Sequence, residues 1–175
     1  DPGFEFRGVA GASYDMRGGG YDAAEAAMFQ RRLLDEVRGL PGVESAAQVI
    51  TEPLNTDAES AGIRLPTEDR APIRSVSVNG VTPDYFDVVG IPIVRGRRFE
   101  EADVTGGTTI VTESTARNLW PNQEPIGQTL LMAVGPDQDI ALEVIGVARD
   151  AQLTVVGQVE PHYLYMPPSP SVAQL

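Results

Sequence analysis

The sequence of 175 residues contains neither cysteine nor lysine, and each absence excludes a kind of chemistry. Without cysteine the chain forms no disulfide, no thiolate metal site and no cysteine nucleophile. Without lysine it lacks the residue that a Walker-type phosphate loop, a Schiff base or a pyridoxal enzyme requires. All 13 basic residues are arginine, and a single histidine is present. The chemistry left to the chain is that of hydroxyls, carboxylates, guanidinium groups and one imidazole.

Acidic residues dominate the charge, since 25 Asp and Glu face 13 Arg and the formal net charge is −12. Nothing in such a chain neutralises a run of phosphates, which argues against a nucleic-acid partner. No stretch reaches the roughly 18 uncharged apolar residues of a membrane span. The sequence starts at Asp1 without a signal-like segment, so we expect an excised piece or a processed domain. The length predicts one domain, or one domain with a smaller lobe.

Apolar periodicity and turn residues predict an α+β fold. The predicted strands cover 4–16, 43–51, 62–65, 73–81, 108–112, 128–134, 139–149 and 162–166, and the predicted helices cover 22–38, 83–90 and 114–120. Residues 17–20 are expected to form a turn, 52–72 to be polar and turn-rich, and 91–107 to be irregular. The opening of the chain is therefore predicted to be a β-α-β unit.

The helix over 22–38 has the strongest local signals. Asp22 and Glu25 have the spacing of a capping box, with Asp in place of Ser or Thr. Ala26, Phe29, Leu33, Val37 and Leu40 repeat at helical spacing and form one apolar stripe. Gly39, Pro41 and Gly42 are expected to stop the helix, and Thr82 with Pro83 is expected to open the short helix over 83–90.

The strand over 139–149 is apolar on both faces. Ile140, Leu142 and Val144 alternate with a second apolar set, Ala141, Ile145 and Val147. Such a strand is expected at the centre of a sheet that is covered on both sides. A hairpin through 135–137 is expected to join it to the strand over 128–134.

Gly18, Gly20 and Ala23 match the spacing of a dinucleotide-binding loop between a strand and a helix. Asp22 places a negative charge where the pyrophosphate would lie, and the preceding segment carries several polar residues. We therefore favour an ordinary turn followed by a helix cap.

Other chemistry-bearing residues also lack the partners that a site requires. His162 has no acid or nucleophile at a characteristic spacing, and we expect a strand histidine near the surface. Glu100, Glu101 and Asp103 follow three arginines, and we expect local charge pairing in a polar loop. A hydrolase built on Ser114, or on Glu100 and Asp103, is the least favoured hypothesis. We assign no catalytic, cofactor-binding or metal-binding residue.

Several segments, taken in order, resemble the extracytoplasmic domain of MacB-type, FtsX-like ABC-transporter permeases, most closely the acidobacterial type. They are LPGVESAA at 40–47, VTPDYFDVVGIPIVRGRRFEEAD at 81–103, TIVTESTARNLWPNQEPIGQTL at 109–130, EVIGVARD at 143–150 and HYLYMPPS at 162–169. Each segment alone is a packing or turn signature. Their joint order across nearly the whole chain makes the resemblance specific.

The resemblance implies a two-lobed domain on the periplasmic side of the cell membrane, between two membrane helices of a permease. It implies a porter-like lobe over 1–82 and 128–175 and a smaller inserted lobe over 83–127. The implied partners are the rest of the permease, a cytoplasmic ATPase and, in the macrolide-exporter branch, a periplasmic adaptor. The fragment itself is expected to be monomeric and to need no cofactor.

The favoured function is thus a non-enzymatic domain that couples ATP hydrolysis to export or partner contact by mechanical transmission. A stand-alone extracytoplasmic ligand-binding or sensory module is the alternative, and it would require a deep apolar pocket with convergent polar groups.

Overall fold

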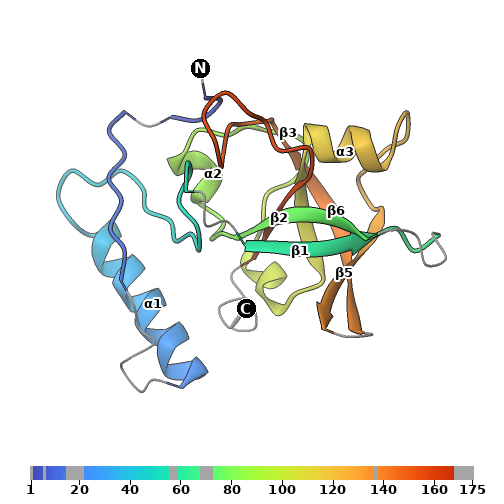
Figure 1. Ribbon diagram of the computed structural model, residues 1–175. Helices are drawn as coiled ribbons and strands as arrows, with labels where there is room; N and C mark the ends of the chain where they lie inside the picture. The colour runs from blue at the N-terminus through green and yellow to red at the C-terminus, as the bar shows by residue number, and fades with distance from the viewer. Residues whose placement is uncertain are drawn as a thin grey trace.

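The computed structural model describes residues 2–5, 7–14, 22–55, 59–67, 73–135 and 138–167, and it confirms the α+β class (Figure 1). The strands are β1 (Glu59–Arg64), β2 (Arg74–Gly80), β3 (Ile93–Gly96), β4 (Thr108–Thr112), β5 (Thr129–Gly135), β6 (Gln138–Ala148) and β7 (Tyr163–Met166). The helices are α1 (Ala23–Arg38), α2 (Tyr85–Val88) and α3 (Glu113–Leu119), with a 3₁₀ turn at Glu101–Thr105.

The seven-stranded sheet closes on itself through β6. Its order is β3-β6-β4-β7-β2-β1-β5, and β5 pairs again with β6. The 11 residues of β6 pair with β5 along the first half of the strand and with β3 and β4 along the second half. Strands β6, β4, β7, β2, β1 and β5 therefore form a closed, barrel-like ring, and β3 extends it at one edge.

Apolar residues fill the ring and cover part of its outside. The inner core takes side chains from each strand of the ring, including Ile63, Val76, Val111, Leu130, Leu142 and Leu164, and α3 adds Leu119 and Trp120. The second core, termed the aromatic core, combines aromatic and aliphatic side chains, and it packs α2 and the loop residue Phe99 against β7 through Tyr85, Phe86, Tyr163 and Tyr165. Two cores back to back explain why β6 and β7 are apolar on both faces.

A bulge in β6 changes the expected alternation. Thr109 of β4 pairs with Val144, and the next residue of β4 pairs with Gly146, so Ile145 is the extra residue. Val147 therefore lies in the inner core with Val144, whereas Ile145 lies in the aromatic core. Two-sided burial is confirmed for Val144–Ala148, but Ala141 is exposed, and the prediction that Val147 shares a face with Ile145 is wrong.

The predicted helix over 22–38 is confirmed in detail. The Asp22 carboxylate accepts hydrogen bonds from the backbone N–H groups of Ala24 and Glu25, and the Glu25 carboxylate accepts one from Asp22 N–H, which completes the capping box. The helix ends at Gly39. In Figure 1, α1 stands apart from the closed sheet.

The strands predicted on either side of α1 do not form in the described residues. Residues 7–14 and 43–48 have no ladder partner, and Val49 makes one isolated bridge with Val81. A strand is stabilised by a neighbour that accepts its backbone hydrogen bonds, and the closed ring leaves no such edge here. Residues 15–16 and the predicted turn at 17–20 lie outside the described residues.

Smaller differences between the predicted and the observed elements occur where a loop residue contacts a residue far away in the sequence. The region over 91–107 was expected to be irregular, but it contains β3 and the 3₁₀ turn. Thr82 was expected to cap the second helix, yet its Oγ1 accepts the N–H of Gln48, and α2 starts only at Tyr85. The predicted strand at 62–65 is the end of a longer β1.

The predicted lobe boundaries at 83 and 127 remain a prediction. Strands β3 and β4 lie within 83–127 and hydrogen-bond to β6, which lies within 128–175. The described sheet therefore does not mark these boundaries.

A matched pair of valines tests the inner core. Val111→Ala removes a side chain that is 0% exposed, and we expect it to lower the free energy of unfolding by about 2 kcal/mol. Val156→Ala, at a side chain that is 71% exposed, is expected to change it by less than about 0.5 kcal/mol. Urea unfolding measures both, and equal effects would contradict the assignment of the inner core.

Candidate functional site

Ser114 lies at the start of α3, where its polar atoms are already engaged. Its N–H donates to Asp150 Oδ1 at 2.8 Å, and its Oγ–H donates to Asp150 Oδ2 at 2.7 Å. One guanidinium nitrogen of Arg117 donates to Ser114 Oγ at 2.7 Å and to Asp150 Oδ2 at 2.8 Å. Asp150 follows the end of β6, so this cluster attaches α3 to the central strand. The arrangement attaches the helix to the strand, and among the described residues it brings no imidazole to the hydroxyl.

His162 takes no part in that cluster. It precedes β7, and its carbonyl oxygen accepts the N–H of Ser77. Partial burial lowers the pKa of the imidazole, and the nearby Arg74 lowers it further. Among the described residues its side chain makes no hydrogen bond to Ser114, and no group of three His, Asp or Glu side chains could hold a metal ion.

Among the acidic residues after β3, Asp103 pairs with Arg97, which confirms the expected charge pairing for that residue. Arg97 donates two hydrogen bonds to Asp103, at 2.6 and 3.0 Å. Asp103 Oδ2 also accepts the N–H of Glu100 at 2.8 Å, and the Asp103 side chain is only 6% exposed. The bond from Arg97 holds the pKa of Asp103 below its usual range against the opposing effect of burial, and the bond to Asp103 raises the pKa of Arg97. These bonds close the 3₁₀ turn and leave Glu100 and Asp103 in structural roles.

The glycine pattern before α1 is only partly described, because Gly18 and Gly20 lie outside the described residues. Ala23 is the first residue of α1. The amides of Ala24 and Glu25, which a bound pyrophosphate would need, already donate to the Asp22 carboxylate. The arrangement around Ala23 is a helix cap.

A buried polar group that the sequence analysis missed fixes the segment before β1. Asn79 is 1% exposed, and its side chain accepts the N–H of Thr51 and donates to the Thr51 carbonyl. It also donates to the hydroxyl of Tyr163, and burial raises the pKa of that tyrosine to about 12. The polar residue in the alternating segment 73–81 was the available signal, but its partners lie 28 and 84 residues away.

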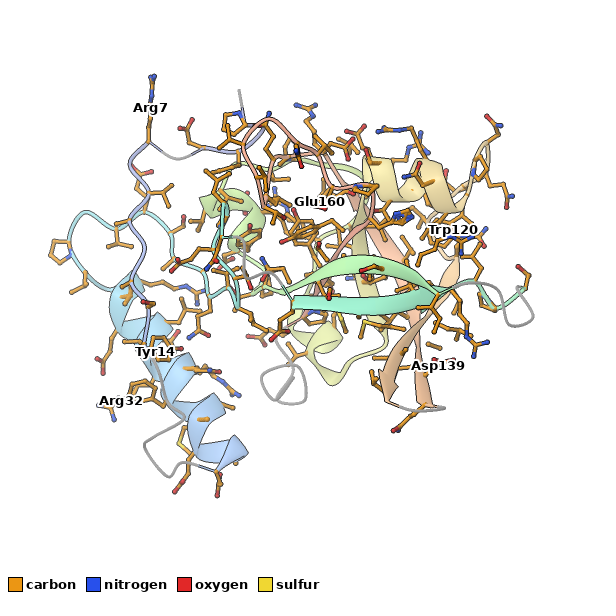
Figure 2. All side chains as sticks on the ribbon, in the orientation of Figure 1. Arg7, Tyr14, Arg32, Trp120, Asp139 and Glu160 are labelled. Carbon is orange, nitrogen blue, oxygen red and sulfur yellow. The ribbon has the colours of Figure 1, made fainter. Side chains whose placement is uncertain are left out.

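An open groove of about 680 Å³ lies beside α3, between β3 and the loop after the helix. Its lining includes Val94, Arg95, Glu113, Arg117, Trp120 and Glu124. Figure 2 shows Trp120 at the end of α3. The two arginines and two glutamates give the lining no excess charge of either sign, and the groove opens to solvent. It therefore differs from the deep apolar pocket that the ligand-binding alternative requires.

The described residues thus form a closed mixed sheet, and several of their buried or part-buried polar side chains are engaged in hydrogen bonds within separate clusters. Comparison with known proteins shows which family has this fold. The family described as MacB-like periplasmic core domain matches residues 5–175, and the chain belongs to that family. The resemblance found in the sequence is confirmed, and the chain is a periplasmic domain of a MacB-like ABC-transporter permease.

Curated relatives are much longer than this chain. A "Macrolide export ATP-binding/permease protein MacB 2" from Aeromonas hydrophila is 30% identical over 134 residues, which are 74% of this chain and 19% of that protein. The "Uncharacterized ABC transporter permease YknZ" from Bacillus subtilis is 26% identical over 117 residues, which are 66% of this chain and 26% of that protein. The chain spans no more than about a quarter of either relative.

Solved structures share the fold. The periplasmic region of MacB from Actinobacillus actinomycetemcomitans has a TM-score of 0.52 at 22% identity, over 77% of this chain and 52% of that one. A domain of a putative permease protein from Porphyromonas gingivalis has a TM-score of 0.53 at 20% identity, over 78% of this chain and 54% of that one. Within the described residues, no helix has the length and apolar character needed to cross a membrane.

The Arg97–Asp103 pair should make stability depend on pH. We expect Asp103→Asn to lower the free energy of unfolding at pH 7 by about 2 kcal/mol, because a charge-assisted bond to a buried carboxylate is lost. The folded pKa of Asp103 is lowered, so its contribution is complete above the unfolded value of about 3.9 and disappears as the pH falls through the folded value.

The difference between the parent chain and Asp103→Asn should therefore shrink below about pH 4. Asp87→Asn breaks an exposed pair with Arg98 and serves as the control, with an expected loss of about 0.5 kcal/mol or less. Denaturant unfolding at several pH values measures the differences. A difference for Asp103→Asn that stays constant down to pH 2 would contradict this role.

Because the Ser114 hydroxyl is already hydrogen-bonded to Asp150 and Arg117, we predict that it does not react as a nucleophile. We expect a fluorophosphonate probe to label it no faster than it labels the heat-unfolded chain, because no imidazole activates the hydroxyl. Peptide mass spectrometry after labelling measures the modified fraction, with Ser114→Ala as the control. Rapid labelling at Ser114 that the alanine variant abolishes would support a hydrolase instead.

Proposed function

We propose that this domain transmits the motion of its permease to partners outside the membrane and performs no bond chemistry itself. The observation that carries the proposal is the closure of the sheet through β6, which joins both cores and α3 into one body. A body of this kind moves as a unit when the chain at one of its ends is displaced. Family membership supports a position on the extracytoplasmic side of a transporter.

The partners of the proposal are the membrane helices of the same permease and a cytoplasmic ATPase that drives them. Relatives named as macrolide export proteins combine ATP-binding and permease parts in one protein, which supports an energy source of this kind. An adaptor outside the membrane is the proposed further partner, as in the macrolide-exporter branch. Transmission requires two states that differ in their contacts with such a partner.

A stand-alone ligand-binding module is the second candidate, and the groove beside α3 is the observation that favours it. The groove is open and mixed in charge, so it is weak support for ligand binding. Closure of the sheet is stronger support for transmission. A thermal-shift screen of the purified chain decides between them. A ligand that raises the melting temperature, with the effect lost in Glu124→Ala at the exposed edge of the groove, would favour the binding module.

If the domain transmits motion, nucleotide binding to the ATPase should move the domain relative to the membrane without changing distances within it. In the full-length permease with its ATPase, a donor dye at Val156→Cys should change its energy transfer to acceptor lipids when an ATP analogue binds. Val156 is 71% exposed, so the label should not disturb packing. A second pair of labels, at Val156→Cys and Glu124→Cys, should report the same distance in both nucleotide states.

A hydrolysis-deficient ATPase provides the control, because it should hold the domain in one position. Unchanged energy transfer to the lipids in every nucleotide state would contradict transmission. A change in the distance within the domain would contradict its rigidity.

A further inference from the structure

Residues 2–5 are hydrogen-bonded at both of their ends to other segments of the body. The N–H of Gln152 donates to the Pro2 carbonyl at 2.8 Å, and the N–H of Glu5 donates to the Val89 carbonyl at 2.7 Å. Figure 1 shows the start of the chain beside the red loop that follows β6. Residues 2–5, termed the strap, thus connect the loop after β6 to the end of α2.

The strap lies so close to the backbone after β6 that a side chain would not fit between them. Gly3 has φ +85°, and a Cβ there would lie 2.9 Å from the Asp150 carbonyl oxygen and 3.0 Å from Ala151 Cα. Both distances are well below the optimal separation of non-bonded heavy atoms, which is roughly 3.5 Å or more. Phe4, the next residue, packs against the aromatic core. The strap is therefore in direct contact with the segment that leaves β6.

Asp150 is also the residue that holds the start of α3. Its carboxylate accepts the N–H and the Oγ–H of Ser114 and a hydrogen bond from Arg117, and its own N–H donates to Glu113 Oε2 at 3.3 Å. Arg117 and Glu113 line the groove beside α3. One residue therefore makes both the backbone contact with Gly3 and the bonds that attach the helix.

The strap thus has a short physical connection to α3, which runs from Gly3 through Asp150 to Ser114. Packed and hydrogen-bonded contacts of this kind carry energetic coupling between separate sites. We propose that the strap is the place where displacement of the permease enters this body, and that the segment 150–152 passes the displacement to α3 and its groove. This inference rests on the proposed transmission of motion, and it adds the point of entry and the surface that moves with it.

A matched pair of glycines tests the contact in the full-length permease. Gly3→Ala places a Cβ against Asp150, whereas Gly8→Ala, also at a positive φ (+75°), meets no described atom within 4 Å beyond its chain neighbours. Hydrogen exchange with mass spectrometry compares α3 with β2. In Gly3→Ala we expect the α3 amides to exchange about tenfold faster than in the parent, because the added Cβ displaces Asp150 from the helix. The β2 amides should keep their parental rate, and Gly8→Ala should change neither element.

Equal exchange of α3 in the two glycine variants would overturn the proposal. A rise of the same size in β2 would overturn it as well, because the whole fold would then be loosened and the effect would not be specific to α3. If Gly3→Ala fails to accumulate, Phe4→Ala takes its place, because it weakens the packing of the strap without a clash. Its control is Val9→Ala, at a side chain that is 42% exposed, and the same comparison of α3 with β2 decides.

Nucleotide-driven motion tests the strap as the point of entry. A donor dye at Glu124→Cys, at the edge of the groove, should change its energy transfer to acceptor lipids when an ATP analogue binds to the full-length permease with its ATPase. We expect Gly8→Ala to keep this change and Gly3→Ala to reduce it by about half or more, because the strap no longer rests on the segment after β6. An undiminished change in Gly3→Ala would overturn the inference and leave the proposed function standing. Absence of the change in the parent protein would instead contradict the proposed function, and the exchange of α3 would then decide the coupling by itself.

Discussion

The pairing of β6 along both of its edges is the interaction on which the rest of the structure depends. One edge of β6 pairs with β5 and, further along the strand, with β3. The other edge pairs with β4. Two glycines permit this crowding. A Cβ on Gly146 would lie 2.4 Å from the carbonyl oxygen of Arg97, and one on Gly96, at φ +70°, would lie 2.2 Å from that of Ile145. The close approach of β3 to β6 thus needs both positions to lack a side chain. The ring itself closes through the pairing of β6 with β5 on one edge and with β4 on the other.

Polar side chains at or near strand ends also hold the fold together. Asp150 follows β6 and binds Ser114 of α3, Arg97 follows β3 and binds Asp103, and Asn79, near the end of β2, binds Thr51. Each bond attaches another segment to the end of a strand, so these polar groups stabilise the fold. This agrees with membership of a family of permease domains. The same bonds explain how residues that suggest hydrolase chemistry in the sequence can instead stabilise the fold.

Local signals were enough to predict the elements whose residue pattern matches the burial that the fold gives them. The capping box predicted α1, and alternation predicted β2, β4, β6 and β7 to within a few residues. The failures are segments with a strand-like pattern that find no neighbouring strand. Residues 7–14 and 43–48 have strand-like patterns, but no described strand offers them an edge. The bulge at Ile145, the bond of Ser114 to Asp150 and the network of Asn79 each depend on register between segments far apart in sequence, which one sequence does not reveal.

Rigidity of the closed ring is the central claim, and native-state hydrogen exchange tests it most directly. If the ring is one body, the slowest amides of β2, β4, β6 and β7 should exchange with a single free energy, equal to that of global unfolding, and should lose protection together as denaturant is added. The account would be contradicted if the β5–β6 hairpin exchanged by a separate opening of lower free energy while β2 and β7 stayed protected, because the ring would then open in the native state.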